Sequence, residues 1–162
     1  MPNELTESLS RFRLSFVLRN PADPYGPAIF EKVVPPLPDA AIVQFENRIG
    51  GKLPASYREF ISQYSDVLIH GGQFQDVSVG VFYGLRSDSV ESYRLDWKFD
   101  VTRGRVSDDW IPITSDTGGN WICLVLKSSN SGSIFWCDHE DPNYTELLAR
   151  SFDDFIAGIH AP

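Results

Sequence analysis

The chain of 162 residues has 42% hydrophobic residues and carries 22 acidic against 14 basic side chains, a formal net charge of −8 at pH 7. This length allows one domain with a substantial core, and the composition excludes a disordered or fibrous chain. No stretch approaches the roughly 20 apolar residues that span a bilayer, and the N-terminus lacks the pattern of a secretory signal. We therefore expect a cytoplasmic protein with no membrane partner.

Acidic residues concentrate in the C-terminal part, where residues 101–162 hold nine acids and four bases. Lys and Arg supply the contacts to nucleic-acid phosphates, so this balance argues against direct nucleic-acid binding. An acidic surface attracts basic partners, although many soluble proteins are acidic for solubility alone. If the charge serves binding, the expected partner is a basic protein.

The first 37 residues predict a strand and a proline-rich lead-in that fold as part of the same unit as residues 38–162. Apolar side chains alternate along residues 11–18, which is typical of a strand. Repeated prolines in residues 20–38 predict an extended, looping segment.

Two successive helices are predicted after residue 38. Asp39 is expected to cap the first helix, and Gly50 with Gly51 to end it in a left-handed turn. The second helix is expected to begin at Pro54, because proline loses no hydrogen bond at the first helical position. Its apolar stripe at helical spacing consists of Leu53, Tyr57, Phe60, Ile61 and Tyr64.

The rest of the chain predicts mainly strands. A helical pattern covers residues 87–99, and Ser151 is expected to cap a closing helix. Alternating or continuous apolar runs indicate strands over residues 66–74, 76–85, 110–114, 121–126 and 133–137. The fold class is therefore α+β, with an N-terminal helical pair, a largely antiparallel sheet and a C-terminal helix.

The glycine pair in residues 116–120 predicts a turn between two strands. A phosphate-binding glycine loop needs a following helix, whereas Gly118 and Gly119 precede the apolar run of residues 121–126. Glycine permits the positive φ of a tight turn, and Asp116 can accept hydrogen bonds from the turn's own amides.

The two cysteines predict buried, reduced thiols on adjacent strands. Two cysteines are too few for a disulfide framework or a four-ligand zinc site. A hairpin centred on Asn130 would place Cys123 directly opposite Cys137. Apolar surroundings make such thiols inert, so we expect no catalytic cysteine and no cofactor.

Residues 138–141 place an imidazole among three carboxylates. Neighbouring side chains on a strand point to opposite faces, so this run favours a solvated turn before Pro142 over a metal site. An alternative is a small metal-dependent hydrolase that uses Asp116, His139 and Glu140. Our main interpretation contains no catalytic, cofactor-binding or metal-binding residue.

The four tryptophans, at positions 97, 110, 121 and 136, are mostly candidates for the core. Trp110 follows Asp108 and Asp109 at the start of a predicted strand, where it can be half exposed. An aromatic side chain beside acids is a plausible anchor for a basic partner.

Several short motifs occur in the order seen in the SUKH superfamily, which the chain resembles from about residue 38 to residue 159. Residues 1–37 lie outside the shared pattern. The matching residues are Glu46, Leu53, Pro54, Tyr57, Phe60, Ile61, Gly71, Gly72, Asp116, Gly118, Gly119, Asn120, Asp138, His139 and Glu140.

The resemblance implies a SUKH-like fold and a protein that acts by binding. The superfamily includes yeast cell-wall-synthesis regulators and many bacterial immunity proteins, several of which neutralise nuclease or deaminase toxins. We expect an immunity protein that occludes a basic toxin domain, or alternatively a regulatory scaffold for endogenous proteins. The expected contact residues are Asp108, Asp109, Trp110, Asp116, Asp138, Glu140 and Asp141.

Overall fold

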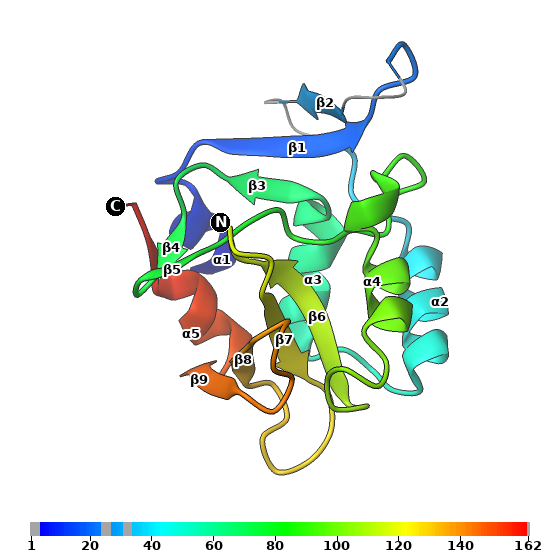
Figure 1. Ribbon diagram of the computed structural model, residues 1–162. Helices are drawn as coiled ribbons and strands as arrows, with labels where there is room; N and C mark the ends of the chain where they lie inside the picture. The colour runs from blue at the N-terminus through cyan, green and yellow to red at the C-terminus, as the bar shows by residue number, and fades with distance from the viewer. Residues whose placement is uncertain (1–3, 24–26, 31–33, 162) are drawn as a thin grey trace.

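Figure 1 shows the protein as a computed structural model, which describes residues 4–23, 27–30 and 34–161. Five α-helices and three antiparallel sheets make up this part of the chain, which confirms the predicted α+β class. Within the described residues, no helix combines the length and apolar character that crossing a membrane requires.

The predicted N-terminal helical pair and the closing helix are present. The α-helices are α1 (Glu4–Leu9), α2 (Asp39–Ile49), α3 (Ala55–Tyr64), α4 (Leu95–Val101) and α5 (Phe152–Ala157). Ser151 caps α5 as predicted, since its Oγ accepts a hydrogen bond from the Asp154 amide at 3.0 Å. Gly50 ends α2 in the left-handed conformation, with a φ of 76°.

The expected starts of α2 and α3 are wrong by one residue. Pro38 and Pro54 occupy the N-cap positions, and neither helix has a side-chain cap. Asp39 is the first residue of α2, and its carboxylate instead pairs with Arg58 on α3 at 2.9 Å. The extended conformation of each proline directs the chain into the helix without a capping side chain.

The strands form three separate sheets. The N-terminal sheet has the order β2-β1-β3, a small sheet has the order β10-β4-β5, and the C-terminal sheet has the order β6-β7-β8-β9. Their bounds are β1 (Leu14–Arg19), β2 (Pro27–Phe30), β3 (Val67–Ile69), β4 (Gln73–Phe74), β5 (Val77–Ser78), β6 (Trp110–Ser115), β7 (Trp121–Val125), β8 (Ile134–Cys137), β9 (Thr145–Ala149) and β10 (Ile159–His160).

The predicted strand over residues 76–85 is mostly wrong, because only Val77 and Ser78 form a strand. The following extended segment bonds alternately to two neighbours. Phe82 donates its amide to Val67 of β3, and Tyr83 donates its amide to Ile113 of β6, both at 2.9 Å. Neither neighbour forms a continuous ladder with the segment, which instead connects the N-terminal and C-terminal sheets.

The predicted helix over residues 87–99 is divided in two. A 3₁₀ turn covers Glu91–Tyr93, Arg94 is extended, and α4 follows. Trp97 on α4 is 40% exposed, so its predicted place in the core is wrong. The helical spacing of residues 87–99 predicted one continuous apolar face. The extended residue Arg94 interrupts the helix, so α4 does not continue that face.

The first described residues pack against the body of the protein. Strand β1 lies between β2 and β3 and begins three residues later than predicted. The predicted lead-in contains β2, whereas its residues 24–26 and 31–33 lie outside the described part of the chain. Apolar side chains that this region buries are Leu9, Phe16, Val17, Leu18 and Leu37.

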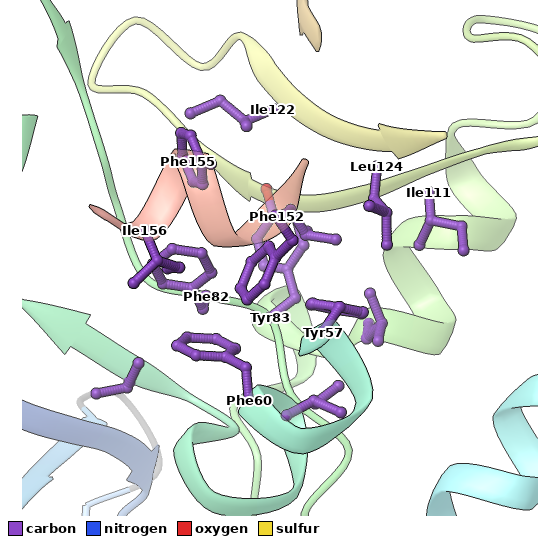
Figure 2. Close-up of a cluster of buried hydrophobic side chains, with 14 of the residues drawn as sticks. Tyr57, Phe60, Phe82, Tyr83, Ile111, Ile122, Leu124, Phe152, Phe155 and Ile156 are labelled. Carbon is purple, nitrogen blue, oxygen red and sulfur yellow. The ribbon is translucent and has the colours of Figure 1, made fainter. Parts of the chain in front are cut away.

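An aromatic cluster forms the centre of the core. Figure 2 shows side chains of α3 and α5 meeting beside β6 and β7. The ring of Phe60 lies 5.1 Å from that of Phe152 and 4.8 Å from that of Phe82, and Tyr57 lies 5.2 Å from Phe152. The predicted stripes of both helices therefore face the same core.

A buried ion pair joins the end of α3 to the segment that follows residue 84. Asp66 is fully buried and Arg86 is 8% exposed, with 3.7 Å between Arg86 Nε and Asp66 Oδ2. A β-carbon on Gly84 would overlap the Asp66 carboxylate, so only glycine fits there. Arg86 also donates hydrogen bonds to the carbonyls of Ser65 and Pro35.

The stability of the protein is expected to depend on the ionisation of Asp66. Burial raises the pKa of Asp66 to about 6, from an ordinary value of 3.8, although neighbouring hydroxyl groups and Arg86 oppose the rise. Between these values the folded state holds a proton that the unfolded state has released. The contribution of Asp66 to the free energy of unfolding is therefore greatest below about pH 4 and falls by roughly 3 kcal/mol as pH rises through about 6.

Urea unfolding of the wild type and of Asp66→Asn across this pH range measures the effect. The Asn variant should gain stability relative to the wild type as pH rises. A difference between the two proteins that stays constant with pH would contradict the raised pKa. The comparison cancels the titration of surface carboxylates, which both proteins share.

Candidate protein-interaction surface

The seven predicted contact residues fall into two groups at opposite ends of the C-terminal sheet. Strands β6 and β8 run in the same direction, because both are antiparallel to β7. The first group, at the start of β6, consists of Asp108, Asp109 and Trp110. The second group, beyond the ends of β6 and β8, consists of Asp116, Asp138, Glu140 and Asp141. The six residues of β6 separate the groups by about 20 Å.

Arg103 holds the first group in place. Its Nη1 donates to the carbonyl of Asp108 and its Nη2 to the carbonyl of Trp110, both at 2.7 Å. Its guanidinium lies 3.9 Å from the ring centroid of Phe99. Burial lowers the pKa of Arg103, and the nearby Asp108 opposes that change. The loop before β6 is thus fixed through its backbone, which leaves the Asp108 side chain exposed.

Asp116 organises the turn between β6 and β7. Its Oδ1 accepts the amides of Gly118 and Asn120, each at 2.9 Å, and its Oδ2 accepts Trp136 Nε1 at 2.9 Å. Gly119 has a φ of 82°, the left-handed conformation that glycine adopts readily. The predicted turn is confirmed, and the Asp116 carboxylate is engaged in building it.

Residues 138–141 form a second turn beside the first. Asp138 Oδ1 accepts the amides of Glu140 at 2.8 Å and Asp141 at 3.3 Å. Asn120 Oδ1 accepts the amide of His139 at 3.2 Å, which joins the two turns. The predicted turn before Pro142 is therefore present; Asp138 holds its backbone, and the side chains of Glu140 and Asp141 are exposed.

The three residues of the alternative hydrolase do not converge. His139 Nε2 lies 4.0 Å from Glu140 Oε1, and His139 reaches Asp116 through the intervening Asn120 side chain. Across residues 4–23, 27–30 and 34–161, no group of three or more His, Cys, Asp or Glu side chains is arranged to hold a metal ion.

An apolar row crosses the outer face of the C-terminal sheet. The ring of Trp110 on β6 stacks on Phe135 of β8, with 4.6 Å between centroids, and Phe135 lies opposite Leu147 of β9. Trp110 is partly exposed, as predicted, and Leu147 is 50% exposed. Trp110, Phe135 and Leu147 together form the aromatic row, named for its two ring side chains.

Beside the aromatic row, on the same face of the sheet, lies a small second core that contains both cysteines. Its buried members are Val106, Trp121, Cys123 and Cys137. Burial raises the pKa of the Cys123 thiol well above its ordinary value, and the neighbouring Cys137 thiol raises it further. A thiol with so high a pKa is a poor nucleophile.

The predicted direct opposition of the cysteines is wrong. Cys123 pairs with Phe135 and Cys137 pairs with Trp121, so the hairpin register differs by two residues. The thiols are diagonal neighbours on adjacent strands, 3.6 Å apart. The pairs of Trp121 with Cys137 and of Leu124 with Ile134 centre the hairpin on Ser129, one residue before the predicted centre at Asn130.

Sequence reasoning missed Phe135 and Leu147 as surface residues. Residues 145–149 read Thr-Glu-Leu-Leu-Ala, and Glu, Leu and Ala favour helices over strands. Pairing with β8 overrides this preference and creates β9. The exposure of Leu147 depends on that pairing, and no local signal indicates it.

An open groove of about 560 Å³ lies on this face and is lined by Asp108 and Trp110 of the first group. One wall comes from the loop before β6, including Arg105 and Asp108, and the other from Asn143 and Thr145 beside the second turn. The surface thus combines an aromatic anchor with acids at both ends, an arrangement suited to contact with another protein.

Most of this chain is similar in sequence to known proteins. The model of the SMI1 / KNR4 family (SUKH-1) matches residues 36–158, which include α2 through α5 and the C-terminal sheet. The chain is also similar to a protein of Bacillus subtilis (strain 168), described as SPbeta prophage-derived uncharacterized protein YokK. The two are 27% identical over 143 residues, which covers 72% of this chain and 71% of that protein. The chain therefore belongs to the SMI1 / KNR4 family (SUKH-1).

Proposed function

We propose that this chain is a bacterial immunity protein that binds a cognate toxin domain of the nuclease or deaminase type and blocks it without catalysis. Membership of the SUKH-1 family supports a binding function. The observation that carries the proposal is the aromatic row, which lies partly exposed between two groups of acids. Aromatic side chains of this kind dominate binding energy at protein interfaces.

The mechanism is occlusion of the toxin's substrate-binding surface. A toxin that acts on nucleic acid needs a basic surface to hold phosphates. The acids at both ends of the C-terminal sheet would attract that surface, and the aromatic row would then be buried against it. The chain would act in the cytoplasm as a decoy for the basic site, without touching nucleic acid or membrane itself.

Co-expression with the protein encoded by the neighbouring gene tests the proposal. Rescue of growth, together with a stoichiometric complex in size-exclusion chromatography, is the expected result. Failure of both would contradict the immunity function and favour the regulatory scaffold, whose endogenous partners a pull-down from native lysate would then identify.

Three of the predicted acids are suited to attract a partner. Asp108, Glu140 and Asp141 are exposed, although Asp141 also accepts the Asn143 amide at 3.2 Å. The other three are partly buried and bonded within their own loops. Those engaged carboxylates belong to Asp109, Asp116 and Asp138. Charge reversal at the exposed positions should therefore alter binding with little effect on folding.

We expect the triple variant Asp108→Lys, Glu140→Lys and Asp141→Lys to bind the toxin more slowly. Electrostatic steering accounts for roughly 10-fold to 1,000-fold in association rates, so a loss of at least about tenfold at low salt is expected. The loss should shrink in high salt, which screens exposed charges. Stopped-flow fluorescence measures the rate. The matched control is the triple variant Asp76→Lys, Asp88→Lys and Glu91→Lys, which makes the same charge change at exposed acids outside the C-terminal sheet. An unchanged rate would refute this choice of surface while leaving growth rescue to decide the immunity function.

A further inference from the structure

Strand β9 is the outermost strand of the C-terminal sheet. Among the described residues it pairs only with β8, and Figure 1 shows it at the margin of the molecule beyond β8. Its residues 145–147 are exposed in succession, whereas every residue of β7 is buried. Successive exposure along a strand means that neither face of the sheet is covered at this edge.

Two backbone positions of β9 point away from the sheet. The Asp138 amide donates to the Tyr144 carbonyl at 3.1 Å, so the Tyr144 carbonyl faces β8. Two residues further along, Glu146 pairs with Trp136 and also directs its backbone polar groups toward β8. Hydrogen-bonding direction alternates along an antiparallel strand, so the polar groups of Thr145 and Leu147 face the open edge. The strand contains no Lys or Pro, the residues that commonly protect such edges.

The open edge also carries exposed apolar side chains. Tyr144 and Leu147 are each 50% exposed, the largest exposed fractions among large apolar side chains of the described residues. Leu147 lies opposite Phe135 and so continues the aromatic row to the edge of the sheet. An edge with unpaired backbone and apolar side chains is a template for pairing with another strand.

The charged residues around β9 favour a basic partner strand over a second copy of this chain. The acids of residues 138–141 precede the strand, and Asp153 and Asp154 follow it, with Arg150 between them as the single base. An antiparallel second copy would bring the acids that precede β9 in one chain against those that follow β9 in the other. Like charges in that arrangement repel, whereas a strand with Lys or Arg side chains is attracted.

We propose that the β9 edge receives an extended, basic strand of the partner protein, which extends the C-terminal sheet. Backbone hydrogen bonds to Thr145 and Leu147 hold the added strand, and its apolar side chains pack on Leu147 and Tyr144. This inference rests on the proposed function for the identity of the partner, a basic toxin domain. It adds the mode of recognition, which is strand addition in place of contact between side chains alone.

Amide hydrogen exchange tests the added strand directly. The probe is the protein of the neighbouring gene in the complex described above. If that complex does not form, the probe is an acetylated synthetic peptide of alternating lysine and valine. Exchange at the Thr145 and Leu147 amides is expected to slow by at least about tenfold when the probe binds, the change produced by one or two net hydrogen bonds.

The variant Thr145→Pro removes an outward amide and should weaken binding of the same probe by at least about tenfold. The matched control Thr145→Val retains the amide and should bind like the wild type. Circular dichroism and thermal unfolding establish that both variants fold. The exchange measurement on the wild-type chain does not depend on either variant.

Each outcome decides the inference separately from the immunity function. A complex that rescues growth but leaves the β9 amides unprotected would overturn strand addition alone. Unprotected amides in the presence of the lysine–valine peptide would overturn it when no toxin complex exists. Sedimentation of the chain alone as a dimer with protected β9 amides would overturn it in favour of a second copy.

Discussion

Deletion of residues 1–37 is expected to abolish cooperative folding of the remaining chain. These residues bury Leu9, Phe16, Val17, Leu18 and Leu37, each at most 7% exposed. Burial of one such side chain contributes about 1.5–3 kcal/mol, so together they match a typical domain's total stability of about 5–15 kcal/mol. The deletion also uncovers Val67 of β3, which is fully buried.

The family match begins at residue 36, so the shared pattern does not include residues 1–35. We propose that residues 1–37 and 38–162 nevertheless fold as one unit in this protein. Calorimetry of the truncated chain should show no sharp transition. A single cooperative transition close to that of the full chain would show that residues 38–162 fold independently.

Point variants separate the loss of buried side chains from the shortening of the chain. Leu18→Asp in the full-length protein should reproduce much of the loss, because it places a charge in the core. Arg19→Asp changes the next, exposed residue, whose guanidinium donates one hydrogen bond to the Ser87 carbonyl. It should cost only about 1 kcal/mol.

The variant Arg86→Met is expected to lower the free energy of unfolding at neutral pH by roughly 3–5 kcal/mol. Removing one partner of a buried ion pair leaves the other charge without compensation. Here the remaining group is Asp66, which is fully buried and accepts a hydrogen bond from the Ser65 hydroxyl on Oδ2 at 2.8 Å. Loss of Arg86 also removes an influence that lowers the pKa of Asp66, so at pH 7 the variant either holds an uncompensated charge or takes up a proton. The substitution also releases the carbonyl of Pro35, which Arg86 binds.

Urea unfolding at pH 7 measures this loss. The control is Arg105→Met, the same change at an exposed arginine, which should alter stability by no more than about 0.5 kcal/mol. The double variant Asp66→Asn with Arg86→Met should recover part of the loss, because no charge remains buried. A double variant less stable than Arg86→Met would contradict this explanation.

Several elements could be predicted from interactions between residues that are close together in the sequence. The closing helix follows from Ser151 and the apolar spacing after it, and the end of α2 follows from Gly50. The turn at Asp116 follows from a carboxylate that bonds amides two and four residues later. In each case the interacting groups lie within one or two turns of chain, so neighbouring residues alone specify the geometry.

Other elements depended on contacts between distant segments. The extended segment after Ser78 bonds alternately to β3 and β6, and β9 forms from residues with helical preference because β8 pairs with it. The cysteine register differed from the prediction by two residues because the pairing of β7 with β8 is centred on Ser129 and not on Asn130. Predicting such features requires the positions of two segments at once. The periodicity of one segment carries no information about the position of the other.

The sequence by itself determined the fold class, the family resemblance, the acidic character and the residue types at the turns. These properties depend on composition, spacing and short-range hydrogen bonding. Only the tertiary structure decided that the predicted contact residues form two separate groups, that Trp97 is exposed, and that Leu147 extends the aromatic row to an open sheet edge. Exposure is a property of what covers a side chain, and the covering atoms come from segments far away in the chain.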